Sequence, residues 1–286
     1  LQTVVFFVFP VVMPPRQSFP SHPRVRDAAA LGFTSSLGPF AANGIMPGFH
    51  AMAEDYGVSF VAVQQSLTIY LFTYAFFSLV AGSFSDSYGR RPTFIGGMLL
   101  FAAASVGAAF SQSLWALYGW RLLQGIGAAV GQVVTQAIVR DNWSGPEAAN
   151  VNGMIAFFFA AGPALAPVVG GQIVMHFGWH AVFLFLMVYS LSIAFFIYFR
   201  IPETLNAADR SAFNLSVICS NYAKGLTHGA FMTGVVAHGI LFMGGILYSA
   251  GSADFVIKVM GLDVDEFGWL SIPLIFASFA GAWGSI

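Results

Sequence analysis

The sequence predicts an all-α polytopic membrane protein, and three observations support this fold class. Charged residues make up 8 % of the 286 residues, whereas soluble domains carry about a quarter. Hydrophobic residues make up 57 %, and so few charges cannot cover that much apolar surface in water. Apolar runs long enough to cross a hydrocarbon core of about 30 Å, which takes about 20 helical residues, follow one another along the chain. Their length and continuity favour helices over the short alternating strands of a barrel.

Residues 1–27 differ from the rest of the chain. They begin with an apolar stretch that lacks a starting Met, a preceding basic segment and a small-residue cleavage site, so it does not qualify as a secretory signal. The following MPPRQSFPSHPRVR is rich in proline, which removes helical hydrogen bonds. We interpret residues 1–27 as a disordered or upstream tail, with Met13 as a candidate start.

Eight apolar runs follow this tail. We expect spans at Ala28–His50, Phe60–Phe84, Pro92–Phe110, Leu114–Val139, Val151–Met175, Trp179–Phe199 and Ala230–Ile257, and an eighth from Phe267 onward. The first six are joined by short loops and form a predicted bundle over residues 28–201. A polar link over residues 202–229 separates them from residues 230–286, the predicted start of a second bundle. The last run is still apolar at the final residue, so we expect a fragment that ends inside span 8.

The basic residues predict the orientation. Nine of the eleven lie before span 1 or in the connections that follow even-numbered spans, and only Lys258 follows an odd-numbered span. Because Lys and Arg concentrate on the cytoplasmic side, we expect a multi-pass protein of the bacterial inner membrane with a cytoplasmic N-terminus.

Several functions find no support in the sequence. The formal net charge is −1 and no basic stripe occurs outside the tail, so we expect no nucleic-acid partner. Cys219 is the one cysteine, which excludes an internal disulfide framework. Histidines and acids never cluster at metal-ligand spacing, and no catalytic constellation is evident. We therefore predict no enzyme activity, no catalytic residue, no metal and no cofactor.

Four segments resemble motifs of the major facilitator superfamily. They are Gly82–Pro92 (GSFSDSYGRRP) between spans 2 and 3, Arg121–Ala129 in span 4, Gly162–Gly171 in span 5 and Pro202–Leu205 after span 6. The chain is most similar to the branch of bicyclomycin and chloramphenicol resistance (Bcr/CflA), which Ala137–Asp141 also fits. This resemblance implies twelve spans in two six-helix halves, a central cavity, and alternating access driven by proton entry.

In Gly82–Pro92, the glycines permit close helix approach and a tight turn, and Asp86 can accept hydrogen bonds from an arginine or a helix N-terminus. We interpret the segment as a latch that closes the cytoplasmic side; the alternative is a topology anchor of basic residues. The predicted gating residues are Gly82, Asp86, Gly89, Arg90 and Arg91.

Arg121 lies inside span 4, where a charge is costly unless it faces water or a partner. It shares one helical face with four other residues, because the intervals are three or four. We expect this face to line the cavity; the alternative is a structural arginine that bonds backbone carbonyls of span 1. The face consists of Arg121, Gln124, Ala128, Gln132 and Thr135.

Span 5 combines prolines, which kink a helix, with glycines, which let a neighbouring helix pack closely. We predict a bend and a packing seam rather than ligand contacts. The residues are Gly162, Pro163, Pro167, Gly170 and Gly171.

Span 1 departs from the family pattern. Asn43 stands four residues before Pro47, where the branch usually has an aspartate, and an amide neither takes up nor releases a proton at physiological pH. We expect Asn43 to contact substrate, and Asp254 near the end of span 7 is the candidate that replaces the missing acid.

The predicted function is a monomeric secondary transporter that exports small, partly hydrophobic organic compounds by proton antiport and alternating access, with the proton gradient as its energy source. One alternative is a metabolite exporter or uniporter without proton coupling in span 1. Another is a non-transporting membrane receptor.

Overall fold

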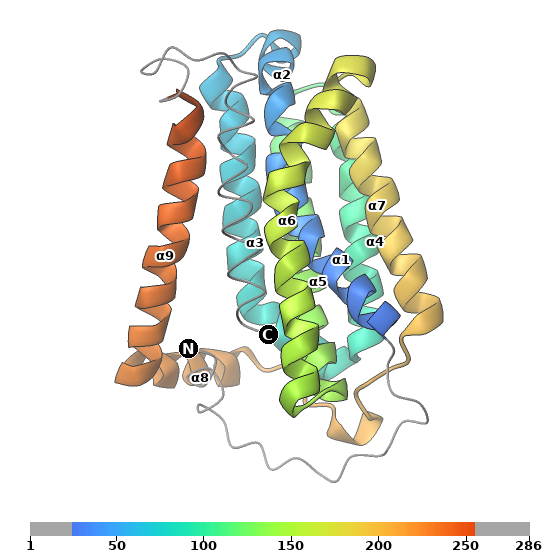
Figure 1. Cartoon of the computed structure of the whole chain (residues 1–286), viewed down its shortest axis with the longest axis vertical. Coiled ribbons are helices and arrows are strands. Elements are labelled where there is room, and N and C mark those ends of the chain that lie inside the picture. Colours follow the sequence, from blue (N-terminus) through green and yellow to red (C-terminus); the bar gives the residue numbers. More distant parts are fainter. Residues whose placement is uncertain (1–24, 255–286) are drawn as a thin grey trace. The chain divides into compact units, whose positions relative to one another are not determined.

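Every regular element in residues 25–254, the part of the chain that the computed structural model describes, is a helix (Figure 1). The elements are α1 (Val25–Asn43), the 3₁₀ helix η2 (Met46–Gly48), α2 (Phe49–Tyr56), α3 (Phe60–Tyr88), α4 (Arg90–Ala109), α5 (Leu114–Asn142), α6 (Gly145–Phe177), α7 (Trp179–Arg200), the 3₁₀ helix η3 (Ala207–Asp209), α8 (Leu215–Thr227) and α9 (Gly229–Asp254). Residues 25–213 form one compact unit, the bundle, and residues 214–254 belong to another. The predicted all-α fold is confirmed over this range.

In the bundle, α5 packs along α3 and α4 and also touches α1; α4 packs on α7, and α1 packs on α6. Large apolar side chains such as Phe94, Phe101 and Phe183 are fully buried in the interior. Large apolar side chains also cover the outside, among them Phe72 at 73 % and Phe195 at 67 % exposure. A surface this apolar suits lipid rather than water.

Four described helices, α3, α4, α5 and α7, are long and apolar enough to cross a membrane. Helix α6 makes a fifth span if its two parts, Gly145–Pro163 and Leu165–Phe177, are joined across a bend of 41°. Prolines 163 and 167 lie inside α6, and each removes a hydrogen bond and crowds the preceding turn.

The predicted first span, Ala28–His50, is not one continuous helix in the structure. Helix α1 begins at Val25 and ends at Asn43, and the chain continues through η2 and α2. Pro47 lies in the first turn of η2, and the residue before a proline is pushed away from α-helical angles. The expected eighth span and the last residues of the seventh lie outside the described residues.

Glycines allow α1 and α6 to approach closely. A side chain on Gly170 would run into the backbone carbonyl of Gly44, and one on Gly162 would stand 3.2 Å from Cβ of Pro39. A Cβ on the next residue, Gly171, would have more room, because it would lie 3.9 Å from Cβ of Pro47. The backbone of α6 at Gly170 is therefore in contact with the backbone of Gly44, the residue directly after α1.

Polar contacts also join α2 to the α4–α5 connection and to α7. The Tyr56 hydroxyl lies 2.7 Å from Ser111 Oγ, and Trp179 Nε1 donates to Asp55 Oδ2 at 2.5 Å. Burial raises the pKa of the Tyr56 hydroxyl above its ordinary value. These bonds tie α2 to the α4–α5 connection and to the first residue of α7.

Candidate functional site

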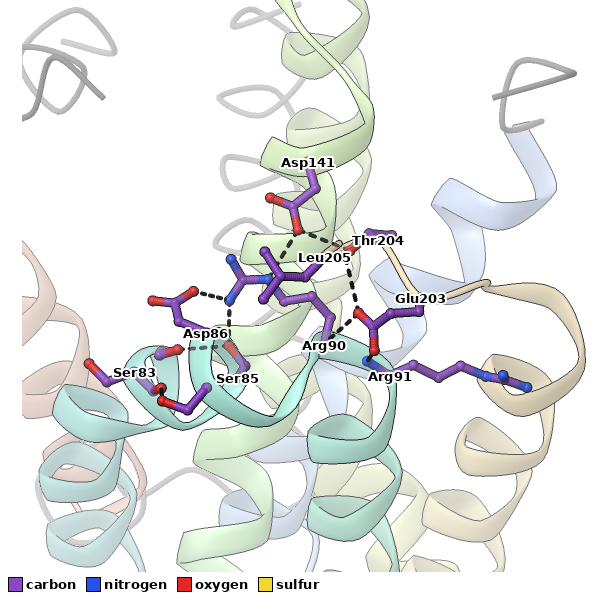
Figure 2. Close-up of polar contacts among 11 residues, drawn as sticks. Ser83, Ser85, Asp86, Arg90, Arg91, Asp141, Glu203, Thr204 and Leu205 are labelled. Atoms are coloured by element: carbon purple, nitrogen blue, oxygen red, sulfur yellow. Dashed lines mark hydrogen bonds and ion pairs between the residues drawn. The ribbon is translucent and has the colours of Figure 1, made fainter. Parts of the chain in front are cut away.

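Arg90 forms the centre of a charged network at the end of the bundle where α3 meets α4 (Figure 2). Its side chain is 8 % exposed. Nη1 pairs with Asp86 and donates to Ser85 Oγ at 2.6 Å, while Nε donates to Asp141 Oδ2 at 3.0 Å. Because Asp141 is the penultimate residue of α5, this one side chain links α3, α4 and α5.

Glu203, which follows α7, completes the network from a distant part of the chain. Its carboxylate accepts the backbone N–H of Arg90 at 2.9 Å and of Arg91 at 3.3 Å (Figure 2). The N-cap of α4 is Gly89, which has no side chain to accept these N–H groups. The positive end of the helix dipole favours an anion at this position. Glu203 is therefore the cap of α4, supplied by the link after α7.

Thr204 extends the same connection. Its hydroxyl donates to Asp141 Oδ2 at 2.9 Å, so the acceptor of Arg90 also holds the link. Glu203 Oε1 in addition accepts the N–H of Leu205 at 3.1 Å. The segment after α7 is thus bonded both to the start of α4 and to the end of α5.

Gly89 makes this close approach geometrically feasible. Its φ of 99° is in the range that side-chain-bearing residues rarely adopt. A Cβ there would lie 2.5 Å from Glu203 Oε2 and 3.0 Å from Arg210 Nη2. Arg91 extends away from Arg90. Its guanidinium donates to the backbone carbonyl of Tyr198 and lies 4.8 Å from the centre of the Tyr198 ring.

Gly82, the remaining predicted gating residue, lies one turn before Asp86 and accepts the Ser85 hydroxyl with its carbonyl at 2.8 Å. The structure thus places all five predicted gating residues at or beside one network. Arg90 and its three carboxylate partners can hold together the turn between α3 and α4, the end of α5 and the link after α7. If one of these partners is lost, the network can release these segments. The network holds positions; it offers no nucleophile or acid–base pair for chemistry.

Arg121 lies in the bundle interior with no exposed surface. Its Nη1 donates to the carbonyl of Ala41 in α1 at 3.3 Å and to Gln124 Oε1 at 3.0 Å. The guanidinium lies 4.4 Å from the centre of the Tyr70 ring, within the range of a cation–π interaction. These are the contacts of the structural alternative, an arginine bonded to a backbone carbonyl of span 1.

Gln124 extends this contact to α4, because its Nε2 donates to Ser105 Oγ at 2.7 Å. Ala128 and Thr135 are buried on the same face of α5. Gln132 is half-buried, and its Oε1 has no hydrogen-bond partner among the described residues. The face that the sequence predicted to line a cavity packs within the bundle for most of its length.

The recorded side-chain bond of Asn43, the residue at the span 1 position, lies within its own helix. Asn43 Nδ2 donates to the Pro39 carbonyl of its own helix at 2.8 Å. Asp254 is the last residue of α9, and its side chain lies outside the described residues. No group of three His, Cys, Asp or Glu side chains that could hold a metal occurs in the described part of the chain.

Sequence reasoning missed two members of the charged network. Asp141 and Glu203 stand 51 and 113 residues from Arg90, so nothing local indicates their contacts. Both lay within motifs used for the family resemblance, Ala137–Asp141 and Pro202–Leu205. An acid in each segment, on the same predicted side of the membrane as Arg90, is the signal that could have found them.

The helical bundle, its apolar outer surface and the internal arginine define a polytopic α-helical membrane protein. The family profile described as Major Facilitator Superfamily matches residues 31–286. The chain belongs to this family.

Two curated relatives refine this assignment. The chain is 31 % identical to the bicyclomycin resistance protein homolog of Haemophilus influenzae, over 87 % of the chain and 64 % of the relative. It is 29 % identical to multidrug resistance protein D of Escherichia coli, over 87 % of the chain and 62 % of the relative. The chain thus spans less than two thirds of the length of either. These similarities support the bicyclomycin and chloramphenicol resistance branch.

A solved structure shows the same fold. The human organic anion transporter MFSD10 matches with a TM-score of 0.64 at 20 % identity, over 91 % of this chain and 73 % of that one. The relatives are named as transporters and resistance proteins, which supports a non-enzymatic membrane protein. None of these names denotes a receptor.

Proposed function

We propose that the protein is a secondary transporter that exports small, partly hydrophobic organic compounds by proton antiport and alternating access. The proton gradient supplies the energy, no cofactor takes part, and the protein works as a monomer. The names of the two relatives support export of drug-like compounds. The observation that carries the mechanism is the Arg90 network, because its partners come from α3, α5 and the link after α7.

In this mechanism the network stiffens one end of the bundle, so that the bundle moves as a body. Asp86 is the exposed member, at 45 % of its side chain, whereas Asp141 is 23 % exposed. Breaking an ion pair with an exposed carboxylate costs less free energy than breaking one with a buried carboxylate, because water can solvate the exposed group. We assign Asp86 the role of the partner that Arg90 loses and regains during the cycle.

We place the network on the cytoplasmic side of a bacterial inner membrane, with the N-terminus also cytoplasmic. The contacts support this placement, since Arg90, Arg91 and Arg210 all lie at one end of the bundle. Lys and Arg concentrate on the cytoplasmic side of membrane proteins.

The test is dye export from cells that express the full-length protein, measured with and without an uncoupler. Wild-type export should stop when the uncoupler is added. Asp86→Asn should reduce export several-fold while the amount of protein in the membrane stays unchanged. Glu147→Gln, a matched change at an exposed acid in the first turn of α6, should export normally. Normal export by Asp86→Asn would refute the assigned role.

One observation favours a second function, a metabolite exporter or uniporter without proton coupling in span 1. The Asn43 amide is satisfied within its own helix and carries no titratable proton. If this alternative holds, export driven by a substrate gradient in proteoliposomes continues without a pH gradient and moves no protons. If protons enter through Asp254 instead, Asp254→Asn abolishes uncoupler-sensitive export.

A further inference from the structure

The guanidinium of Arg121 has one bonded side and one side without partners. Nη1 donates to the Ala41 carbonyl and to Gln124 Oε1. Nε and Nη2 are buried, and neither has a hydrogen-bond partner in the described part of the chain. In the planar fork of a guanidinium, the Nε–H and one Nη2–H point the same way and form two parallel donors. The unbonded side is therefore a side that can bind a carboxylate with two hydrogen bonds.

No carboxylate of the described bundle pairs with this charge. Arg121 is the eighth residue of α5 and lies inside the helix, whereas the acids lie at helix ends or in connections. Those at the ends nearest in sequence have other partners, because Asp141 bonds Arg90 and Asp55 accepts from Trp179. The acids of residues 25–213 are Asp27, Glu54, Asp55, Asp86, Asp141, Glu147, Glu203 and Asp209.

A buried cation without a counterion is costly. Arg121 has no exposed surface, and an arginine side chain keeps its charge in proteins. A buried charge that is left uncompensated is strongly destabilising. The two neutral acceptors and the cation–π contact with Tyr70 offset part of this cost. An anion bonded to Nε and Nη2 would compensate the charge and satisfy both donors.

The surroundings of Arg121 are neutral and aromatic. The ring centres of Tyr70 and Phe183 lie 4.4 Å and 6.0 Å from Cζ of the guanidinium. Asn43, two residues beyond Ala41 in α1, is an amide and brings no negative charge that would repel an anion. Two aromatic rings beside a carboxylate-binding fork match a compound in which an aromatic body carries the carboxylate.

We propose that Arg121 recognises a carboxylate on the exported compound through Nε and Nη2, with the aromatic body of the compound against Tyr70 and Phe183. The substrate class is then a small aromatic monocarboxylate. This inference rests on the proposed export function, because the movements of alternating access open the interior to the compound. The bond from Arg121 to the Ala41 carbonyl is long, at 3.3 Å, against about 2.7–3.2 Å for ordinary N–H···O bonds. Helix α1 is therefore the side that separates at low cost.

The test compares two probes of the same shape, 1-naphthoate and its neutral amide, 1-naphthamide. Their affinities for the full-length protein in nanodiscs are measured by calorimetry in chloride-free buffer without a proton gradient. Arg121→Lys keeps the charge but lacks the two parallel donors. Arg140→Lys makes the same change at an exposed arginine in the last turn of the same helix. Solid-state NMR between carbon-13 in the naphthoate carboxylate and nitrogen-15 in the arginine side chains detects direct contact.

Wild-type protein should bind naphthoate at least about tenfold more tightly than naphthamide, as expected for charge-assisted hydrogen bonds. Arg121→Lys should weaken naphthoate binding about tenfold and remove the NMR contact, while its affinity for naphthamide stays unchanged. Arg140→Lys should behave as wild type in both measurements. Chloride at the same concentration as naphthoate should not displace it, because a single ion cannot occupy the aromatic surface.

Equal affinity of the wild type for the two probes would overturn the proposal, and this comparison stands even if Arg121→Lys does not fold. An NMR contact that persists in Arg121→Lys would place the carboxylate at another arginine. Displacement by an equal concentration of chloride would show an inorganic anion site instead. Naphthoate that binds but is not exported would refute the export function and support the site. Normal dye export without naphthoate binding would refute the site alone.

Discussion

Removing the carboxylate of Glu203 should destabilise the start of α4, although Glu203 is 113 residues away from Arg90. The carboxylate satisfies two N–H groups that the helix leaves without partners. Loss of a capping side chain costs about 0.5–2 kcal/mol, and an anion at a helix N-terminus contributes about 0.3–1 kcal/mol. We therefore expect Glu203→Ala to cost about 2 kcal/mol. Glu203→Gln, which keeps one neutral acceptor, should cost about 1 kcal/mol.

Two measurements on the full-length protein in detergent check these values. About 2–4 °C of melting temperature per kcal/mol is typical for domains of 150–250 residues, so Glu203→Gln should melt about 2–4 °C lower and Glu203→Ala about twice as far. Hydrogen exchange at the amides of Arg90 and Arg91 should accelerate about 30-fold in the alanine variant, because each 1.4 kcal/mol corresponds to a factor of about ten and the expected cost is about 2 kcal/mol.

Glu147→Gln serves as the control, since Glu147 is an exposed acid in the first turn of α6. It should change the melting temperature by about 1 °C or less, because an exposed acid in a first turn contributes about 0.3 kcal/mol. If Glu203→Gln and Glu147→Gln behave alike, and exchange at the two arginine amides is unchanged, the capping role is refuted.

Three further substitutions test other contacts. Gly170→Ala should prevent close packing of α1 on α6 and abolish folded protein in a size-exclusion assay, whereas Gly171→Ala, with room for a Cβ, should fold; equal yields would contradict the seam. Arg121→Ala should abolish export and cost about 2–3 kcal/mol, because the buried Ala41 carbonyl and Gln124 lose a hydrogen-bond partner. Arg121→Lys should restore stability only in part because lysine lacks the planar fork; wild-type melting of the alanine variant would be inconsistent with its contacts. Asp55→Ala, which removes the acceptor of the Trp179 N–H and leaves the indole in place, should lower the melting temperature by about 3–6 °C, as expected for a part-exposed charged hydrogen bond at the low end of about 1.5–3 kcal/mol; an unchanged melting temperature would show that the bond contributes nothing.

Much of the fold follows from local sequence. Long apolar runs specify helices of membrane-crossing length because every backbone polar group must be bonded within the lipid. Caps such as Ser59 and Ser113 accept N–H groups at the first turns of α3 and α5, which is a local effect. The break of the first predicted span at Asn43 was missed, since the run remains apolar through the 3₁₀ turn.

The contacts of the site depend on long-range packing. The sequence indicated that Asp86, Gly89 and Arg90 act together, because they lie within one helix end and the turn after it. It did not indicate that Glu203 caps α4, and a charged side chain has no periodicity that reveals a partner in another segment. Only the packing of α5 and α7 beside α4 places that carboxylate within hydrogen-bond distance.

The case of Arg121 shows the same division. The sequence by itself determined that a charge lies inside an apolar helix, and the cost of that charge required a partner. It left open whether the partner was water in a cavity or a backbone carbonyl of span 1. Only the tertiary structure supplied partners for the guanidinium, because α1 and α3 bring the Ala41 carbonyl and the Tyr70 ring to it, while Arg121 Nε and Nη2 have no hydrogen-bond partner among the described residues. Local sequence sets which groups must be satisfied, and the packing of distant helices sets which groups satisfy them.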